Sequence, residues 1–219
     1  MKPRVSHQKT AALTRADALV ILVLVAIAVL FWPFLFPQQA QRMAHKINCV
    51  NNLAQIGLAY RIWEGDHNDK YPMQVSVTNG GAMELVSEGN AWINFSVMSN
   101  ELSVPFYLIC PQDAKHQPPA TNFSQQLAGH LSYFVGLARK ESDPQSILSG
   151  DDNFEIIGVP RRSGLLELSS NTPIAWTPDR HGFGGNILLG DGSVQSLANS
   201  NLVRQFNQTG LATNRLAIP

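Results

Sequence analysis

The chain has 219 residues and a formal net charge of zero. That zero hides an uneven distribution, because up to Trp63 the sequence holds seven Lys and Arg but a single acid, Asp17, whereas the remainder holds nine basic and fifteen acidic residues. A basic arm is therefore joined to an acidic body. No basic surface interleaved with aromatic residues follows the arm, which argues against nucleic acid as a partner.

Directly after Asp17, the segment from Ala18 to Phe36 consists of nineteen consecutive apolar residues. As a helix with a rise of about 1.5 Å per residue it reaches roughly 28 Å, close to the hydrocarbon thickness of a bilayer. Basic residues precede this predicted span, so the positive-inside rule places the N-terminus in the cytoplasm and exports the rest of the chain. They are Lys2, Arg4, Lys9 and Arg15.

A cleaved secretory signal is the alternative for the same segment. The stretch "FPQQA" offers a small-residue cleavage site ending at Ala40. Signal cores have about 7 to 15 apolar residues, which is shorter than this run. We therefore expect an anchor that is retained.

Beyond the span, the apolar pattern narrows to one face of a predicted amphipathic helix. Its members recur at steps of three and four: Met43, Ile47, Val50, Ala54, Gly57 and Tyr60, with Leu53, Ile56 and Trp63 alongside. Neither Pro nor Gly occurs between Gln38 and Ile56, so one rod from about Ala18 to Trp63, roughly 70 Å long, is expected. We expect Pro33 to kink this rod rather than end it.

The body, residues 64–219, has enough residues for one domain. Helical spacing is expected over residues 81–102, broken near Gly89. Short apolar runs separated by turn residues then predict strands of an antiparallel sheet packed on the long helix, an α+β fold. The runs are "FYLIC", "LSYFVGL", "FEIIGV", "LLELS", "PIAWT", "NILLG" and "SVQSL".

Two local features close the predicted body. Asp191 and Gly192 can supply the positive backbone angles of a tight hairpin turn. A short helix from about Asn201 to Gln208, stopped at Gly210, precedes a coil tail.

The two cysteines, Cys49 and Cys110, both fall on the exported side, where disulfides persist. We predict that they are bonded to each other. The alternative is a pair of buried free thiols.

Catalytic motifs give little support to an enzyme. "HGFGGN" does not follow the dinucleotide-binding spacing, and no nucleophile elbow, phosphate loop or His-Glu-x-x-His motif occurs. His181 and Asp191 are expected to shape the hairpin and its entry. The scattered histidines and cysteines do not form a transition-metal pattern. We therefore expect no enzymatic activity and no required cofactor.

Three stretches resemble the type IV pilin-like proteins, specifically the pseudopilins associated with type II secretion. "AALTRADALVILVLVAI" is similar to the prepilin cleavage and methylation segment. "INCVNNLAQIGLAYRIWEGDHNDKYP" and "LICPQD" are similar to the helix exit and second cysteine segment, and "HGFGGNILLGDGSVQSL" to the C-terminal His-Gly, Asn and Asp-Gly pattern. The resemblance implies a pilin-like α+β fold with a long N-terminal helix.

The resemblance also implies roles for individual residues. Residues 1–12 become a leader cut between Ala12 and Leu13, and Leu13 becomes the N-methylated first residue of a long helix over 13–63. Asp17 takes the place of the family's glutamate and pairs with the free amine of Leu13 on a neighbouring subunit. The alternative for Asp17 is a boundary residue held at the cytoplasmic interface.

The resemblance makes calcium a candidate ligand, because some secretion pseudopilins bind it in the globular domain. "SGDDNFE" offers Asp151, Asp152, Asn153 and Glu155 as oxygen ligands, and "GDHND" offers Asp66, Asn68 and Asp69. Neither stretch has EF-hand spacing. Solvated acidic turns are the alternative that we favour.

Together these observations predict a single-pass protein of the bacterial inner membrane, with its head, residues 64–219, in the periplasm. The resemblance implies a structural subunit of a secretion pseudopilus. Its partners would be the membrane, the prepilin peptidase, other pilin-like subunits and the assembly platform. The alternative is a signal-anchored periplasmic binding domain that does not polymerise.

Overall fold

A computed structural model of the protein describes all residues except 1–13, 36, 117, 125–126, 138–142 and 161. The chain divides into two compact units, residues 1–41 and 42–219. The second unit contains the globular body and also the C-terminal part of the long helix. From here on, the word head means this larger unit, residues 42–219.

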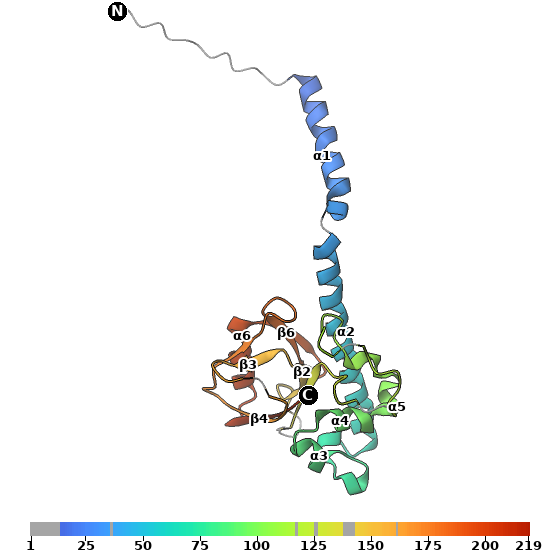
Figure 1. Cartoon of the computed structure of the whole chain (residues 1–219), viewed down its shortest axis with the longest axis vertical. Helices are drawn as coiled ribbons and strands as arrows, with labels where there is room; N and C mark the ends of the chain where they lie inside the picture. Colours follow the sequence, from blue (N-terminus) through green and yellow to red (C-terminus); the bar gives the residue numbers. More distant parts are fainter. Residues whose placement is uncertain (1–13, 36, 117, 125–126, 138–142, 161) are drawn as a thin grey trace, which may run out of the picture. The chain divides into compact units, whose positions relative to one another are not determined.

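The N-terminal part of the chain is described as two helices, α1 (Arg15–Leu35) and α2 (Pro37–Asp66) (Figure 1). They lie on either side of Phe36, which falls outside the described residues. Pro37 begins α2, a position where its missing N–H leaves no hydrogen bond unmade. The helix over Arg15–Leu35 includes Pro33, as expected.

Short helices follow α2 and precede the sheet. Gly89 lies between two of them with a φ of 98°, so the expected break at this residue is confirmed. The predicted strand "FYLIC" is wrong, because Pro105 starts a 3-10 helix there. The short helices are η1 (Pro72–Gln74), η2 (Val77–Asn79), α3 (Met83–Ser87), α4 (Ala91–Val97), α5 (Ser99–Leu102) and η3 (Pro105–Leu108).

The head contains a six-stranded antiparallel sheet in the order β4-β8-β1-β2-β6-β7, and β3 pairs with β5 separately. Six of the seven predicted runs form strands. The strands β2 and β8 were not predicted. The bounds are β1 (Tyr133–Gly136), β2 (Ile147–Asp151), β3 (Phe154–Ile156), β4 (Gly164–Ser169), β5 (Ile174–Trp176), β6 (Gly184–Leu189), β7 (Val194–Ala198) and β8 (Thr213–Ile218).

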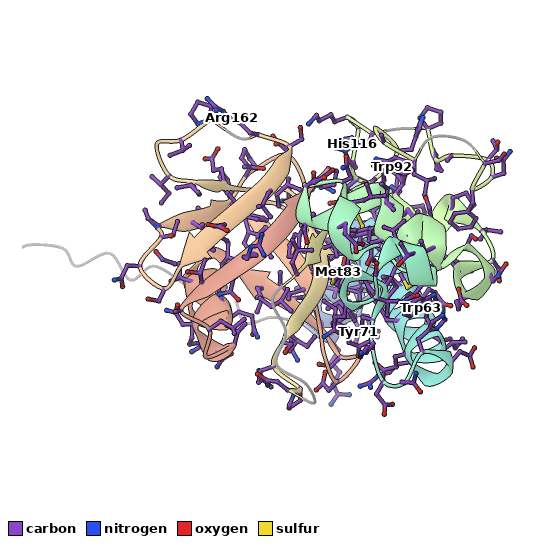
Figure 2. All side chains as sticks on the ribbon, turned by 90° about the horizontal axis from the view of Figure 1, so that it is seen from below. Trp63, Tyr71, Met83, Trp92, His116 and Arg162 are labelled. Carbon is purple, nitrogen blue, oxygen red and sulfur yellow. A yellow bond between two sulfur atoms is a disulfide. The ribbon has the colours of Figure 1, made fainter. Side chains whose placement is uncertain are left out.

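Both faces of the six-stranded sheet are covered. On one face, Tyr133, Val135 and Leu188 belong to a core shared with α2 and the short helices. On the other face, Phe134, Ile187 and residues of β8 pack with α6 (Asn199–Gln208), β3 and β5. In Figure 2 the labelled Trp63, Tyr71, Met83 and Trp92 mark the helical side of the head, and Arg162 lies on the side of β4.

The long helix approaches the sheet closely at Gly57. A Cβ atom on this residue would lie 2.9 Å from Cδ1 of Leu188, a distance that forces the leucine to move. The absence of a side chain therefore allows α2 to pack directly on β6. The expectation that the sheet packs on the long helix is confirmed, and α6 with the small sheet adds a layer that was not expected.

The turn between β6 and β7 differs in one detail from the expectation. Gly192 takes a φ of 85°, but Asp191 is absent from the residues with positive φ. Gly192 N donates to Leu189 O at 2.9 Å, and Leu189 N donates to Ser193 O at 2.9 Å. This is a three-residue loop whose last residue is left-handed, so only one positive angle is needed.

The C-terminal end of the chain corrects another expectation. The helix α6 confirms the one predicted near Asn201. The residues expected to form a coil tail are instead strand β8, which pairs with both β4 and β1. The last strand thus lies inside the sheet rather than at its edge.

Candidate functional site

The helix α1 is apolar on every side, and its described side chains are exposed. A window from Arg15 to Trp32 is long and apolar enough to cross a membrane. Helices that are hydrophobic all round are buried in a large core or in a bilayer. The expected membrane span is therefore present in length and composition.

Asp17, in the first turn of α1, forms hydrogen bonds with Thr14, the residue directly before the helix. Its Oδ2 accepts from Thr14 N at 2.9 Å and from Thr14 Oγ1 at 2.8 Å, and Asp17 N donates back to Thr14 Oγ1 at 3.2 Å. This reciprocal arrangement is a capping box, with Asp17 in the place of the usual Glu. The expected partner Leu13 and the leader residue Ala12 lie outside the described residues.

The helix α2 has two apolar faces. Its buried face holds Cys49, Leu53, Ile56, Tyr60 and Trp63, whose side chains pack in the core. The second face is exposed, and we call it the outer stripe: Met43, Ile47, Ala54, Leu58 and Ile62. At 3.6 residues per turn the two faces are centred about 180° apart.

The single apolar face predicted from the sequence therefore combined residues that belong to two different faces of the helix. Gly57 and Tyr60 are buried, but Met43 is 65 % exposed and Ile47 is 58 % exposed. Spacing alone identifies an apolar position without showing which neighbour covers it. The head covers one of the two faces.

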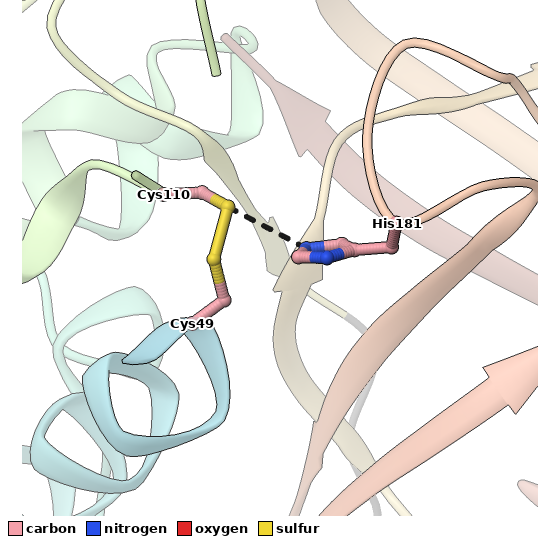
Figure 3. Close-up of side chains that lie close together, drawn as sticks. All are labelled: Cys49, Cys110 and His181. Atoms are coloured by element: carbon pink, nitrogen blue, oxygen red, sulfur yellow. Dashed lines mark hydrogen bonds between the residues drawn. A yellow bond between two sulfur atoms is a disulfide. The ribbon is translucent and has the colours of Figure 1, made fainter. Parts of the chain in front are cut away.

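A disulfide joins Cys49 on α2 to Cys110, which follows η3, as predicted. The imidazole of His181 lies against it, with Nε2 3.4 Å from Cys110 Sγ (Figure 3). The same Nε2 is 3.4 Å from Oδ2 of Asp151, and the His181 side chain is completely buried.

The segment around His181 has an uncommon backbone. His181, Gly182 and Phe183 have φ values of 56°, 61° and 61°. Two of these three left-handed residues carry side chains, and such conformations persist where surrounding contacts determine them. His181 N donates to Gln112 Oε1 at 2.9 Å, and the preceding Arg180 is anchored in the interior.

Arg180 forms the centre of a buried ionic network. Its Nη1 lies 3.1 Å from Asp113 Oδ2, and its Nη2 pairs with Asp152. Asp113 Oδ2 also contacts His116 Nδ1 at 2.7 Å and accepts from Ser132 Oγ at 2.7 Å. Burial alone would raise the pKa of Asp113, but these hydrogen bonds and the Arg180 charge together lower it below its ordinary value.

The calcium candidates Asp151, Asp152 and Asn153 are buried, not solvated. Asp151 Oδ2 accepts from Asn186 N and Nδ2 at 2.7 Å each. Asn153 Nδ2 donates to the carbonyls of Arg180 and Gly184. The favoured alternative of a solvated acidic turn is therefore wrong for this stretch, because these residues anchor the strand ends in the interior.

The other acidic candidates lie at the exposed end of α2. Asp66, Asn68 and Asp69 are exposed, and the last two have positive φ values of 55° and 60°. They remain a solvated turn, as favoured from the sequence. Asp191 stays within its hairpin, where Oδ1 accepts from Ser193 N at 2.8 Å. The Ser193 hydroxyl first, and then this backbone bond, lower the pKa of Asp191.

The buried network draws its members from distant segments. Asp113 and His116 come from the loop after η3, Ser132 precedes β1, Asp152 follows β2 and Arg180 precedes β6. Sequence reasoning missed Asp113, His116 and Arg180. One indirect signal was present in the sequence: the segment "LICPQD", quoted above for its cysteine, ends at Asp113, and "HGFGGN" directly follows Arg180.

In comparisons with protein-family models, curated proteins and solved structures, nothing matches this chain.

Proposed function

We propose that the protein is a pilin-like structural subunit, a pseudopilin, of a type II secretion or related filament system. It is anchored in the bacterial inner membrane by α1, with its N-terminus in the cytoplasm and its head in the periplasm. The sequence resemblance at both ends of the chain supports this proposal. So do a single apolar N-terminal helix, an antiparallel sheet packed on α2, and a disulfide suited to an oxidising compartment.

The observation that carries the proposal is the outer stripe of α2. A tether needs only one apolar face, the one that packs on its own head. The outer stripe instead exposes Met43, Ile47 and Leu58, and large apolar side chains left exposed along one side of a helix suit a contact with a partner. A subunit whose helices pack against each other in a filament has a use for this second face.

A non-polymerising, signal-anchored binding domain is the second candidate. The capping box favours it, because the carboxylate of Asp17 is already hydrogen-bonded to Thr14 within its own helix. In that arrangement the acid begins the helix and needs no neighbouring subunit.

The N-terminus of protein purified from native membranes distinguishes the two candidates. We expect intact mass and terminal peptide sequencing to give a chain beginning at N-methylated Leu13. A chain that retains Lys2 to Ala12 would overturn the filament proposal in favour of a permanent anchor. Replacing Asp17 with Asn then tests pairing, since normal assembly of that variant would limit the acid to a capping role.

The outer stripe is tested by Leu58→Glu. The substitution places a charge in the middle of the exposed stripe, so we expect the subunit to be lost from assemblies sheared from the cell surface. The matched control is Gln55→Glu, which adds the same charge to an exposed polar position of the same helix. Both variants should keep the head folded, as judged by circular dichroism. Equal assembly of the two variants would count against the stripe as a subunit contact.

A further inference from the structure

Neither ring nitrogen of His181 has an oxygen or nitrogen partner at ordinary hydrogen-bond length among the described residues, and Nε2 contacts Cys110 Sγ at 3.4 Å. Nε2 faces Asp151 Oδ2 at 3.4 Å, beyond the usual 2.7–3.2 Å for nitrogen and oxygen. Nδ1 is buried and has no partner among the residues that the structure describes. A fully buried polar side chain in this state requires an explanation.

The atoms around Nε2 form a set of metal-ligating donors. Cys49 Sγ, Cys110 Sγ and the His181 ring nitrogen all lie within 4.8 Å of one another. Donors held in a tetrahedral shell at the usual zinc distances are about 3.3–3.8 Å apart. The separation of 3.4 Å from His181 Nε2 to Cys110 Sγ falls in this range.

The charges nearby favour a cation. The carboxylates of Asp113, Asp151 and Asp152 are buried, with Arg180 as the one buried Lys or Arg side chain in the described part of the head. Asp151 Oδ2 is held by two bonds from Asn186, and Ser196 Oγ in turn donates to Asn186 Oδ1 at 2.6 Å. These contacts hold the negative charge of Asp151 beside the ring nitrogen of His181.

The geometry points to a redox-gated metal site. When a dithiol reductant converts the Cys49–Cys110 disulfide to two thiols, it supplies two electrons and two protons and becomes a disulfide itself. Cys49, Cys110 and His181 then bind one Zn²⁺ as its three protein ligands, and the two thiols release their protons as thiolates bind the ion. In the disulfide form the sulfurs are bonded to each other and the site is closed to the metal.

A hollow on the surface of the head lies beside this site. It has a volume of about 580 Å³ and is lined by His181, Gln112 and Gly182, and also by Met43, His45 and Lys46 of α2. Cys110 lies next to Pro111 of the same lining. This inference concerns the head alone and does not depend on the proposed filament role.

Cobalt binding to the full chain in detergent micelles tests the inference. The protein is reduced with a phosphine, freed of reductant under nitrogen and titrated with Co²⁺, followed by competition with Zn²⁺. We expect one Co²⁺ per chain in the reduced protein, with thiolate-to-cobalt charge-transfer absorption and the strong visible bands of tetrahedral cobalt. The disulfide form should show neither.

His181→Gln separates this site from simple binding to two thiols. We expect its affinity for Zn²⁺ to fall by about 10- to 100-fold, as loss of even an outer partner does. His130→Gln is the matched control, because His130 contacts the carbonyl of Pro118 and does not belong to the group of metal-ligating donors. Equal affinity of His181→Gln and the parent chain would overturn the inference, and so would reduced protein without charge-transfer absorption. If reduction unfolds the head, Zn²⁺ must restore its circular dichroism in the parent chain and fail to do so in His181→Gln.

Discussion

The carboxylate of Asp113 is kept charged in the interior of the head by the groups around it. Its side chain is 4 % exposed, yet it contacts Arg180, His116 and the Ser132 hydroxyl. Removing one partner of a buried ion pair leaves the other charge uncompensated, which costs far more than the net worth of the pair. The residue is therefore a sensitive position for folding.

Asp113→Asn tests this view of the network. The variant keeps the shape but removes the charge, and we expect its free energy of unfolding at pH 7 to fall by about 3 kcal/mol. Urea denaturation followed by circular dichroism measures the loss. Glu167→Gln is the control, because Glu167 and Arg215 form an exposed pair that should be worth less than about 1 kcal/mol. Equal effects of the two substitutions would show that burial does not govern the pair.

The pH dependence of stability follows from the lowered pKa of Asp113. A group whose pKa is lower in the folded state stabilises the fold fully above its unfolded value, about 3.9 for Asp. This contribution is lost as the pH falls through that value toward the folded pKa. The parent chain should therefore lose stability more steeply than Asp113→Asn on acidification below about pH 5, in denaturation curves recorded at several pH values.

These residues show where sequence reasoning stops at the scale of single side chains. The pairing of Cys49 with Cys110, which the structure confirms, was predicted because the sequence has two cysteines and both lie after the predicted membrane span. The pairing of Asp113 with Arg180 joins positions far apart in a chain with many acids and bases, so no pattern singles it out. The topology of the sheet brings them together.

At the scale of elements, patterning predicted strands where the residues are mostly apolar and missed those that include polar residues. The strand β2 reads "ILSGD", and its Ser149 is satisfied by donating to Phe134 O at 2.7 Å. The strand β8 reads "TNRLAI", whose first half is polar. Conversely, "FYLIC" is apolar enough for a strand, but Pro105 directly precedes it and starts a 3-10 helix that includes its first three residues. Short apolar runs do not distinguish a strand from a helical turn.

The position of β8 inside the sheet gives a prediction for this element. Leu216 is buried and pairs with Leu166 of β4 and Gly136 of β1. A charge in this position has no partner, so we expect Leu216→Asp to unfold the head or lower its melting temperature sharply. Thr213→Asp is the control, since Thr213 is exposed at the start of the same strand and should change stability by less than about 0.5 kcal/mol. A coil tail would tolerate both substitutions, so similar melting temperatures would contradict the assignment of β8.

At the scale of the whole molecule, two interactions fix α2 to the rest of the head. One is the apolar packing of its buried face, and the other is the disulfide, which joins residues 61 positions apart. The outer stripe takes no part in either. The helix can therefore be fixed to its own head and still present an apolar surface, which is the combination that a subunit needs if its helix is to contact other copies.

The disulfide should accordingly be a major contribution to the stability of the head. In the chain-entropy model, closing a loop of this length stabilises the fold by about 4 kcal/mol, because it restricts the unfolded chain. We expect the double variant Cys49→Ala with Cys110→Ala to lose about this amount in urea denaturation, and to show a larger slope with urea because its unfolded state exposes more surface. The parent chain treated with a thiol reductant, in the absence of added metal, should approach the variant, which itself should not respond to the reductant. An unchanged free energy of unfolding would mean that packing alone fixes α2 to the sheet. The fold would then hold its long helix without the covalent link.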